Sequence, residues 1–122
     1  PLPEGYTLVE GEATPEFTAR PFLYSAMYRG RQAAVCRGRL YPGLTSPMGG
    51  VIGQLGHVGT QEAHRGKGLA RILVLRSLAK LREWGASEAL IATSLDNFPA
   101  LKAYENAGFQ RRYNINEWSK EL

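Results

Sequence analysis

A strongly periodic stretch near the middle of the chain, residues 68–84, restricts the fold more than any other feature of the sequence. Apolar residues recur in it at three-residue steps, and four basic residues occupy the polar side. This pattern predicts an amphipathic helix with one apolar stripe, and Gly85 supplies a stop. The stripe comprises Leu69, Ile72, Leu75, Leu78 and Leu81, broadened by Leu73, Val74 and Ala79.

Four segments typical of β-strands precede this helix. They are Tyr6–Glu10, Phe22–Tyr28, Gln32–Tyr41 and Val51–Thr60, and a turn at 29–31 joins the second and third into a hairpin. Proline, glycine and serine predict a loop over Pro42–Gly50. The fourth strand carries glycines at 53, 56 and 59, which often mark a bulge or the close passage of a ligand.

Three further elements are expected after the helix. Ala89–Thr93 is a short apolar strand, Pro99–Ala107 a second helix, and Phe109–Trp118 a last strand. The order predicts one domain over residues 1–122 of class α/β (α+β), with three layers. Its central sheet is expected to be mixed and mainly antiparallel, with helices flanking it.

Composition excludes several classes of protein. A single cysteine, Cys36, rules out an internal disulfide and a cysteine-rich metal site, and its apolar surroundings favour a buried structural thiol. Two histidines, His57 and His64, are too few for a zinc site without a nearby carboxylate pattern, so no metal is expected. No apolar run approaches the roughly 20 residues that span a bilayer. We therefore expect a cytoplasmic protein without a membrane partner.

A formal net charge of +4 favours a polyanionic partner, although a solvated basic surface is the simpler interpretation. Aromatic and basic residues do not interleave as they do in proteins that bind single strands, which argues against nucleic acid. A small polyphosphate would use the same charge more economically.

The segment Arg65–Ala70 has the composition of a phosphate site at the point where strand gives way to helix. Its glycines let the backbone bend closely around a ligand, and the first N–H groups of a helix have no partner within it. Together with the positive end of the helix dipole they suit a pyrophosphate, although a glycine-rich turn without a ligand has the same composition. A P-loop is excluded because Gly68 follows Lys67, and a dinucleotide fingerprint because Arg71 stands where glycine is needed.

Two motifs resemble those of the GNAT superfamily of acyl-CoA-dependent N-acyltransferases. Arg65-x-x-Gly68-x-Ala70 is similar to the superfamily signature Gln/Arg-x-x-Gly-x-Gly/Ala at the start of the central helix. The segment from Asn97 to Phe109 is similar to its N-x-x-A-x-x-x-Y-x-x-x-G-F pattern. The resemblance covers roughly residues 22–118 and implies that acetyl-CoA is the cosubstrate and a primary amine the acceptor.

The resemblance also implies where the coenzyme lies. Backbone groups of Val58, Gly59 and Thr60 would pair with the pantetheine arm, and Asn97 and Asn106 would touch the coenzyme again. The pyrophosphate would lie against basic Arg65 and the N–H groups of Gly66, Lys67, Gly68, Leu69, Ala70 and Arg71.

Direct transfer of the acetyl group is the mechanism that the resemblance implies. Tyr104 matches the tyrosine that protonates the departing thiolate, although a packed aromatic is an alternative for it, as a helix cap is for Asn97. Some relatives carry a glutamate base five residues before the asparagine, where this chain has Ala92. His57 is the candidate base instead, because imidazole titrates near neutrality.

A second departure concerns the acceptor half of the site. Relatives have two helices between their first two strands, whereas only about eleven residues, 11–21, stand there in this chain. Residues 1–20 are therefore interpreted as a remnant of a shortened N-terminal region. Compared with the family, the C-terminal side is also expected to be one strand short after Phe109–Trp118. A non-catalytic acyl-CoA-binding module, or half of a tandem or oligomeric acetyltransferase, is the alternative function, and a homodimer could complete the short outer strands.

Overall fold

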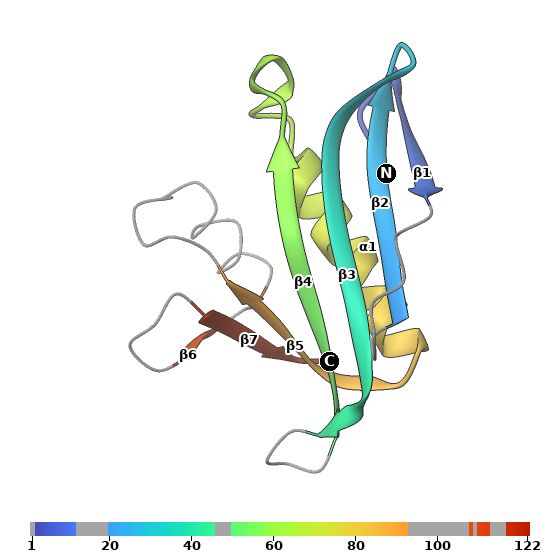
Figure 1. The fold of residues 1–122 in the computed structure, drawn as a ribbon. Helices are drawn as coiled ribbons and strands as arrows, with labels where there is room; N and C mark the ends of the chain where they lie inside the picture. Colours follow the sequence, from blue (N-terminus) through green and yellow to red (C-terminus); the bar gives the residue numbers. More distant parts are fainter. Residues whose placement is uncertain (1, 12–19, 46–49, 93–107, 109, 113–116) are drawn as a thin grey trace.

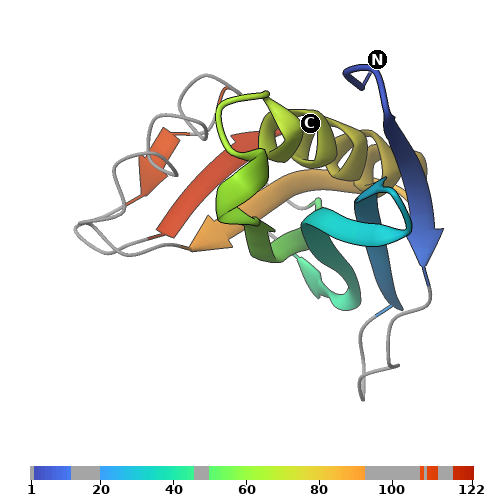
Figure 2. The same cartoon turned by 90° about the horizontal axis from the view of Figure 1, so that it is seen from above.

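A computed structural model describes residues 2–11, 20–45, 50–92, 108, 110–112 and 117–122 of the chain. Within this part, seven strands form one sheet in the order β1-β2-β3-β4-β5-β7-β6, and one α-helix crosses a face of it (Figures 1 and 2). The elements are β1 Tyr6–Gly11, β2 Arg20–Tyr28, β3 Arg31–Thr45, β4 Val51–Thr60, η1 Glu62–His64, α1 Leu69–Glu83, β5 Ala86–Ala92, β6 Gln110–Arg112 and β7 Glu117–Glu121.

The sheet is mixed and mainly antiparallel, as the sequence predicts. Neighbouring strands are antiparallel except β4 and β5, which run in the same direction. Two parallel neighbours require a crossover connection, and α1 supplies it. The start of α1 therefore lies at the same end of the sheet as the end of β4.

The core lies between α1 and the sheet face that it covers. Phe22, Tyr24 and Ala26 of β2, together with Leu55 of β4 and Ile91 of β5, are buried there. Gly53 belongs to the same face, because a Cβ on it would lie 2.7 Å from a methyl carbon of Leu81. Of the glycines predicted to mark a bulge or a ligand, this one instead makes room for the helix.

The buried stripe of α1 differs from the predicted one. The helix buries Leu69, Leu73, Val74, Ser77, Leu78 and Leu81, whereas Ile72 is half-buried and Leu75 is 42% exposed. Steps of three residues fall about 60° short of a full turn, so a run of them drifts around the helix and leaves the buried face. Steps of four compensate for this drift, which is why Leu73 and Ser77 are buried.

Cys36 is a buried thiol, as predicted. Its side chain is fully buried, with its sulfur 3.2 Å from the hydroxyl of Ser77. That hydroxyl donates a hydrogen bond to the Leu73 carbonyl oxygen at 2.7 Å, which satisfies a polar group in the core. Burial raises the pKa of Cys36 to about 11, and the side-chain contact with Ser77 partly opposes the rise.

Two predictions about strands are wrong. The loop predicted over Pro42–Gly50 begins later, because β3 continues to Thr45 past a shift in register between Tyr41 and Thr45. An irregular pairing of this kind tolerates the missing N–H of a proline. The single last strand predicted over Phe109–Trp118 is two antiparallel strands, β6 and β7, so the C-terminal side is not one strand short. The helix predicted over Pro99–Ala107 lies outside the described residues.

β1 is fastened to the rest of the domain at both of its ends. Near its end, Glu10 forms an ion pair with Lys80 of α1 at 2.9 Å. At its start, the hydroxyl of Tyr6 lies 2.6 Å from Nδ1 of His64, in η1. The first strand therefore joins the sheet, the helix and the turn that leads into the helix.

Candidate functional site

The last five residues of β4 have a strand neighbour on one side only within the described part of the chain. β4 pairs with β5 from Val51 to Leu55 and with β3 as far as Thr60. Leu55 pairs with Ile91, one residue before β5 ends at Ala92, and β4 continues past the end of β5 in Figure 1. The backbone of 56–60 therefore presents an edge along which an extended ligand could pair.

The turn between β4 and α1 is shaped by two glycines in left-handed conformation. Gly66 has φ 82° and Gly68 has φ 76°, values that other residues adopt only with strain. A Cβ on either would meet no described atom within 4 Å, so the backbone is open to close approach. The side chains of Arg65 and Lys67 are exposed on the same turn.

The start of α1 has the electrostatic character of an anion site. Gly68 is the N-cap, and no side chain caps the helix there. The first helical hydrogen bond runs from the N–H of Ile72 to the carbonyl oxygen of Gly68, which leaves the N–H groups before Ile72 without a partner in the helix. The first turn carries no acidic residue, and Arg71 is exposed beside it. Helix dipole and side-chain charge thus favour an anion together.

Three attachments hold the segment just before these N–H groups. The N–H of Gln61 donates to the carbonyl oxygen of Ala33 at 2.8 Å, and Nε of Arg65 donates to that of Thr60 at 3.3 Å. The third is the contact between Tyr6 and His64. Sequence reasoning considered His64 only as a metal ligand and missed Tyr6, because nothing local links residues 58 positions apart.

The structure brings together the predicted coenzyme-binding residues on β4 and on the turn. Val58, Gly59 and Thr60 end β4, and Gly66, Lys67, Gly68, Leu69, Ala70 and Arg71 follow at the start of α1. The side chain of Leu69 is buried in the core, so only its backbone is open to a ligand.

The remaining predicted site residues stay predictions. Asn97, Tyr104 and Asn106 lie outside the described residues. His57 lies in β4, and its side chain is outside the described part of the structure. Ala92 is the last residue of β5.

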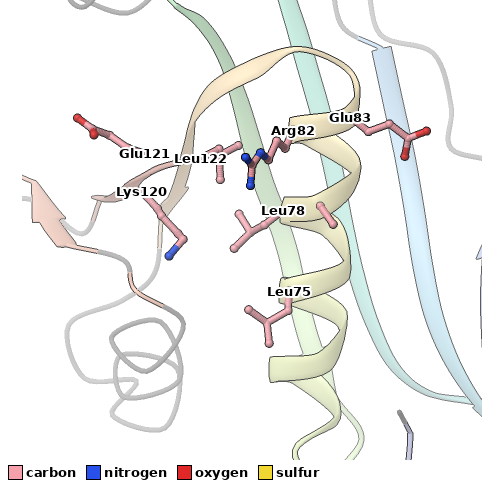
Figure 3. Close-up of a pocket in the computed structure, with 8 residues that line it drawn as sticks. Leu75, Leu78, Arg82, Glu83, Lys120, Glu121 and Leu122 are labelled. Carbon is pink, nitrogen blue, oxygen red and sulfur yellow. The ribbon is translucent and has the colours of Figure 1, made fainter.

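A separate open groove of about 700 Å³ lies beside the C-terminal half of α1 (Figure 3). Leu75, Leu78 and Arg82 of α1 line one side, and Lys120 and Leu122 line the other. The groove lies away from the turn and the start of α1, so it is not part of the site described above.

The described residues contain neither a metal-binding cluster nor a membrane-spanning helix. No group of three or more histidine, cysteine, aspartate or glutamate side chains in this part of the chain is arranged to hold a metal ion. The same part contains no helix with the length and apolar character needed to cross a bilayer.

Related sequences are found among acetyltransferases. The chain is 37% identical over 69 residues to mycothiol acetyltransferase of Corynebacterium aurimucosum, which covers 57% of this chain and 23% of that protein. It is 36% identical over 73 residues to "Probable N-acetyltransferase family 8 member 5" of Mus musculus, covering 60% and 32%. The chain thus spans about a quarter to a third of the length of these curated relatives.

Solved structures share the fold. A chain of the NatC complex bound to Gag peptide and CoA superposes with a TM-score of 0.71 at 21% identity, covering 82% of this chain and 70% of that one. A GNAT family acetyltransferase from Elizabethkingia anophelis with acetyl-CoA bound gives 0.70 at 14% identity, covering 98% and 100%. The sequence itself matches the Acetyltransferase (GNAT) family over residues 3–109. With this fold and this match over most of its length, the chain belongs to the Acetyltransferase (GNAT) family.

Proposed function

We propose that this protein is an N-acetyltransferase that transfers an acetyl group from acetyl-CoA to a primary amine. The observation that carries the proposal is the uncapped, basic start of α1, reached by a short turn from β4, whose edge facing β5 has no described strand partner beyond Leu55. Because the chain belongs to the Acetyltransferase (GNAT) family, we take the ligand of this arrangement to be acetyl-CoA.

The coenzyme would lie along β4 and the turn. N–H groups of 66–71 would bind the pyrophosphate, with the charges of Arg65 and Lys67 beside it. The edge of Val58–Thr60 would pair with the pantetheine arm as a strand pairs with a strand. Asn97 and Asn106 are proposed as further contacts, on the strength of the second family motif.

Transfer would be direct. The amine forms a bond to the thioester carbonyl carbon while a backbone N–H of Val58–Thr60 donates to the carbonyl oxygen. The carbon–sulfur bond then breaks, and Tyr104 donates its phenolic proton to the departing thiolate. His57 is proposed to accept the proton that the attacking amine loses.

Binding is tested first, by thermal unfolding with CoA, acetyl-CoA and ATP. A ligand at about a hundredfold over its dissociation constant adds about 2.7 kcal/mol to the free energy of unfolding. We expect CoA and acetyl-CoA to stabilise the parent and ATP not to. Gly68→Asp should abolish the shift, because a carboxylate would repel the pyrophosphate.

Gly30→Asp is the matched control for that variant. Gly30 has φ 78°, and a Cβ on it also meets no described atom, but it lies in the turn between β2 and β3. The control therefore carries the same backbone strain and the same charge, and it should bind CoA like the parent. Equal shifts in all three proteins would contradict the proposed coenzyme site.

Catalysis is tested by the release of free CoA from acetyl-CoA in the presence of a panel of primary amines. Tyr104→Phe should lower kcat by about 10²–10⁴-fold, the contribution of a positioned general acid, and leave coenzyme affinity unchanged. Coenzyme binding without turnover by any amine would favour the non-catalytic acyl-CoA-binding module instead.

A further inference from the structure

Three aromatic side chains, Tyr6, Tyr28 and His64, form a cluster beside the turn that leads into α1. The hydroxyl of Tyr6 lies 2.6 Å from Nδ1 of His64, and it donates the hydrogen bond when that nitrogen carries no proton. The ring of Tyr28 is 4.9 Å from that of Tyr6 and 5.2 Å from that of His64, between centroids. The rings of Tyr6 and His64 meet edge to face at 5.5 Å.

The cluster joins parts of the molecule that are far apart in the sequence. Tyr6 begins β1 and Tyr28 ends β2, where the two residues are register partners, whereas His64 ends η1. His64 is followed directly by Arg65 and by the glycines of the turn. A displacement of His64 therefore moves Arg65, the first residue of the proposed pyrophosphate site at 65–71.

Among the described residues, few contacts hold the shape of the turn itself. Gly66, Lys67 and Gly68 are exposed, and no side chain caps the helix at Gly68. A row of N–H groups binds an anion tightly only if its geometry is set before the ligand arrives. The described contacts that set it flank the turn, and the Tyr6–His64 hydrogen bond is the one that reaches to the first strand.

We propose that Tyr6 and His64 are positioning residues for the coenzyme, and that β1 takes part in coenzyme binding through them. The inference rests on the proposed function, because the ligand of the turn is taken to be the pyrophosphate of CoA. It gives the N-terminal strand a role in the site that no motif in the sequence assigns.

Tyr6→Phe removes the hydroxyl and keeps the ring. We expect the dissociation constant of CoA, measured by calorimetry, to rise about fivefold, the effect of losing one hydrogen bond. Binding of S-acetylpantetheine, which has no pyrophosphate, should not change. If Tyr6 had a merely structural role, the variant would bind both ligands less tightly by the same factor, or bind both as the parent does. The ratio of the two affinities therefore distinguishes a positioning role from a structural one.

Two further variants keep this test sharp. His64→Asn places an amide oxygen near the position of Nδ1, where it can accept from the Tyr6 hydroxyl, and should retain CoA affinity. His64→Leu removes the acceptor and should resemble Tyr6→Phe. Tyr41→Phe is the matched control, because it removes a half-buried hydroxyl that donates to Gln54 at 3.0 Å, away from the turn.

Hydrogen exchange supplies a second readout of the coupling between β1 and the turn. Coupling between two sites is reciprocal. CoA bound at the turn before α1 should therefore slow the hydrogen exchange of the backbone amides of β1, Tyr6–Gly11. Tyr6→Phe should reduce that added protection.

The outcomes separate this inference from the function on which it rests. If the parent binds no CoA, the proposed function fails and the inference fails with it. If the parent binds CoA and Tyr6→Phe binds it equally well, or binds both ligands less well by the same factor, the inference alone is overturned. A selective loss for CoA with retention in His64→Asn supports it.

Discussion

Gly53 shows how a single residue sets the distance between α1 and the sheet. A Cβ there would lie 2.7 Å and 2.8 Å from the two methyl carbons of Leu81, whereas a Cβ on Gly56, in the same strand, meets no described atom within 4 Å. We expect Gly53→Ala to lower the free energy of unfolding by about 1–3 kcal/mol through overpacking, and Gly56→Ala to change it by less than about 1 kcal/mol. Urea unfolding of both variants checks this, and equal effects would contradict it.

The burial of Cys36 predicts how slowly its thiol reacts. Its pKa of about 11 in the folded state lies above the 9.0 of an exposed thiol because burial disfavours the thiolate. Two pKa units leave about a hundredfold less thiolate at pH 8, so a thiol reagent such as DTNB should label the native protein at least that much more slowly than the unfolded one. Labelling at similar rates would show that the thiol is accessible.

The raised pKa of Cys36 also determines the direction in which the free energy of unfolding changes with pH. A folded-state pKa above the unfolded value has no effect below about pH 9 and lowers the free energy of unfolding as the pH rises toward 11. The loss from this thiol is at most about 3 kcal/mol. Cys36→Ala should lose less stability than the parent between pH 8 and pH 10.5, as measured by urea unfolding at each pH.

Two leucines of α1, two positions apart, test the orientation of the helix. Leu73 is fully buried in the core, and Leu75 is 42% exposed on the outer side. Leu73→Ala should therefore lower the free energy of unfolding by about 2–5 kcal/mol, because it leaves a cavity. Leu75→Ala should lower it by less than about 1 kcal/mol, and comparable losses would place the helix in a different rotation.

At the scale of elements, the sequence predicts strands and helices better than it predicts their faces and ends. Val51–Thr60 is a strand with the predicted bounds, because glycines precede it at 49 and 50 and polar Gln61 and Glu62 follow it. The three-residue period places Leu75 in the stripe, but contact with the sheet selects the four-residue steps. Between β6 and β7, Asn114 and Asn116 are residue types that favour turns, a signal against one continuous strand.

For the molecule as a whole, the net charge of +4 predicts how salt affects ligand binding. An exposed basic turn attracts a polyphosphate through charges that salt screens, whereas the core depends on apolar contacts. Raising NaCl from about 50 mM to about 500 mM should weaken CoA binding roughly tenfold and change the free energy of unfolding by less than about 1 kcal/mol. If the affinity for CoA did not change with salt, this would argue against a pyrophosphate site made of basic residues and N–H groups.

The sequence by itself determined the central helix, the strand before it and the glycine-rich, basic turn that joins them. These features depend on residues within a few positions of one another, so periodicity and composition reveal them. Two features were decided only by the tertiary structure: the extent of the pairing between β4 and β5, which reaches Leu55 in the described residues, and the contact of Tyr6 with His64. Each depends on how distant surfaces pack, and that free energy is not present in any short segment of the chain.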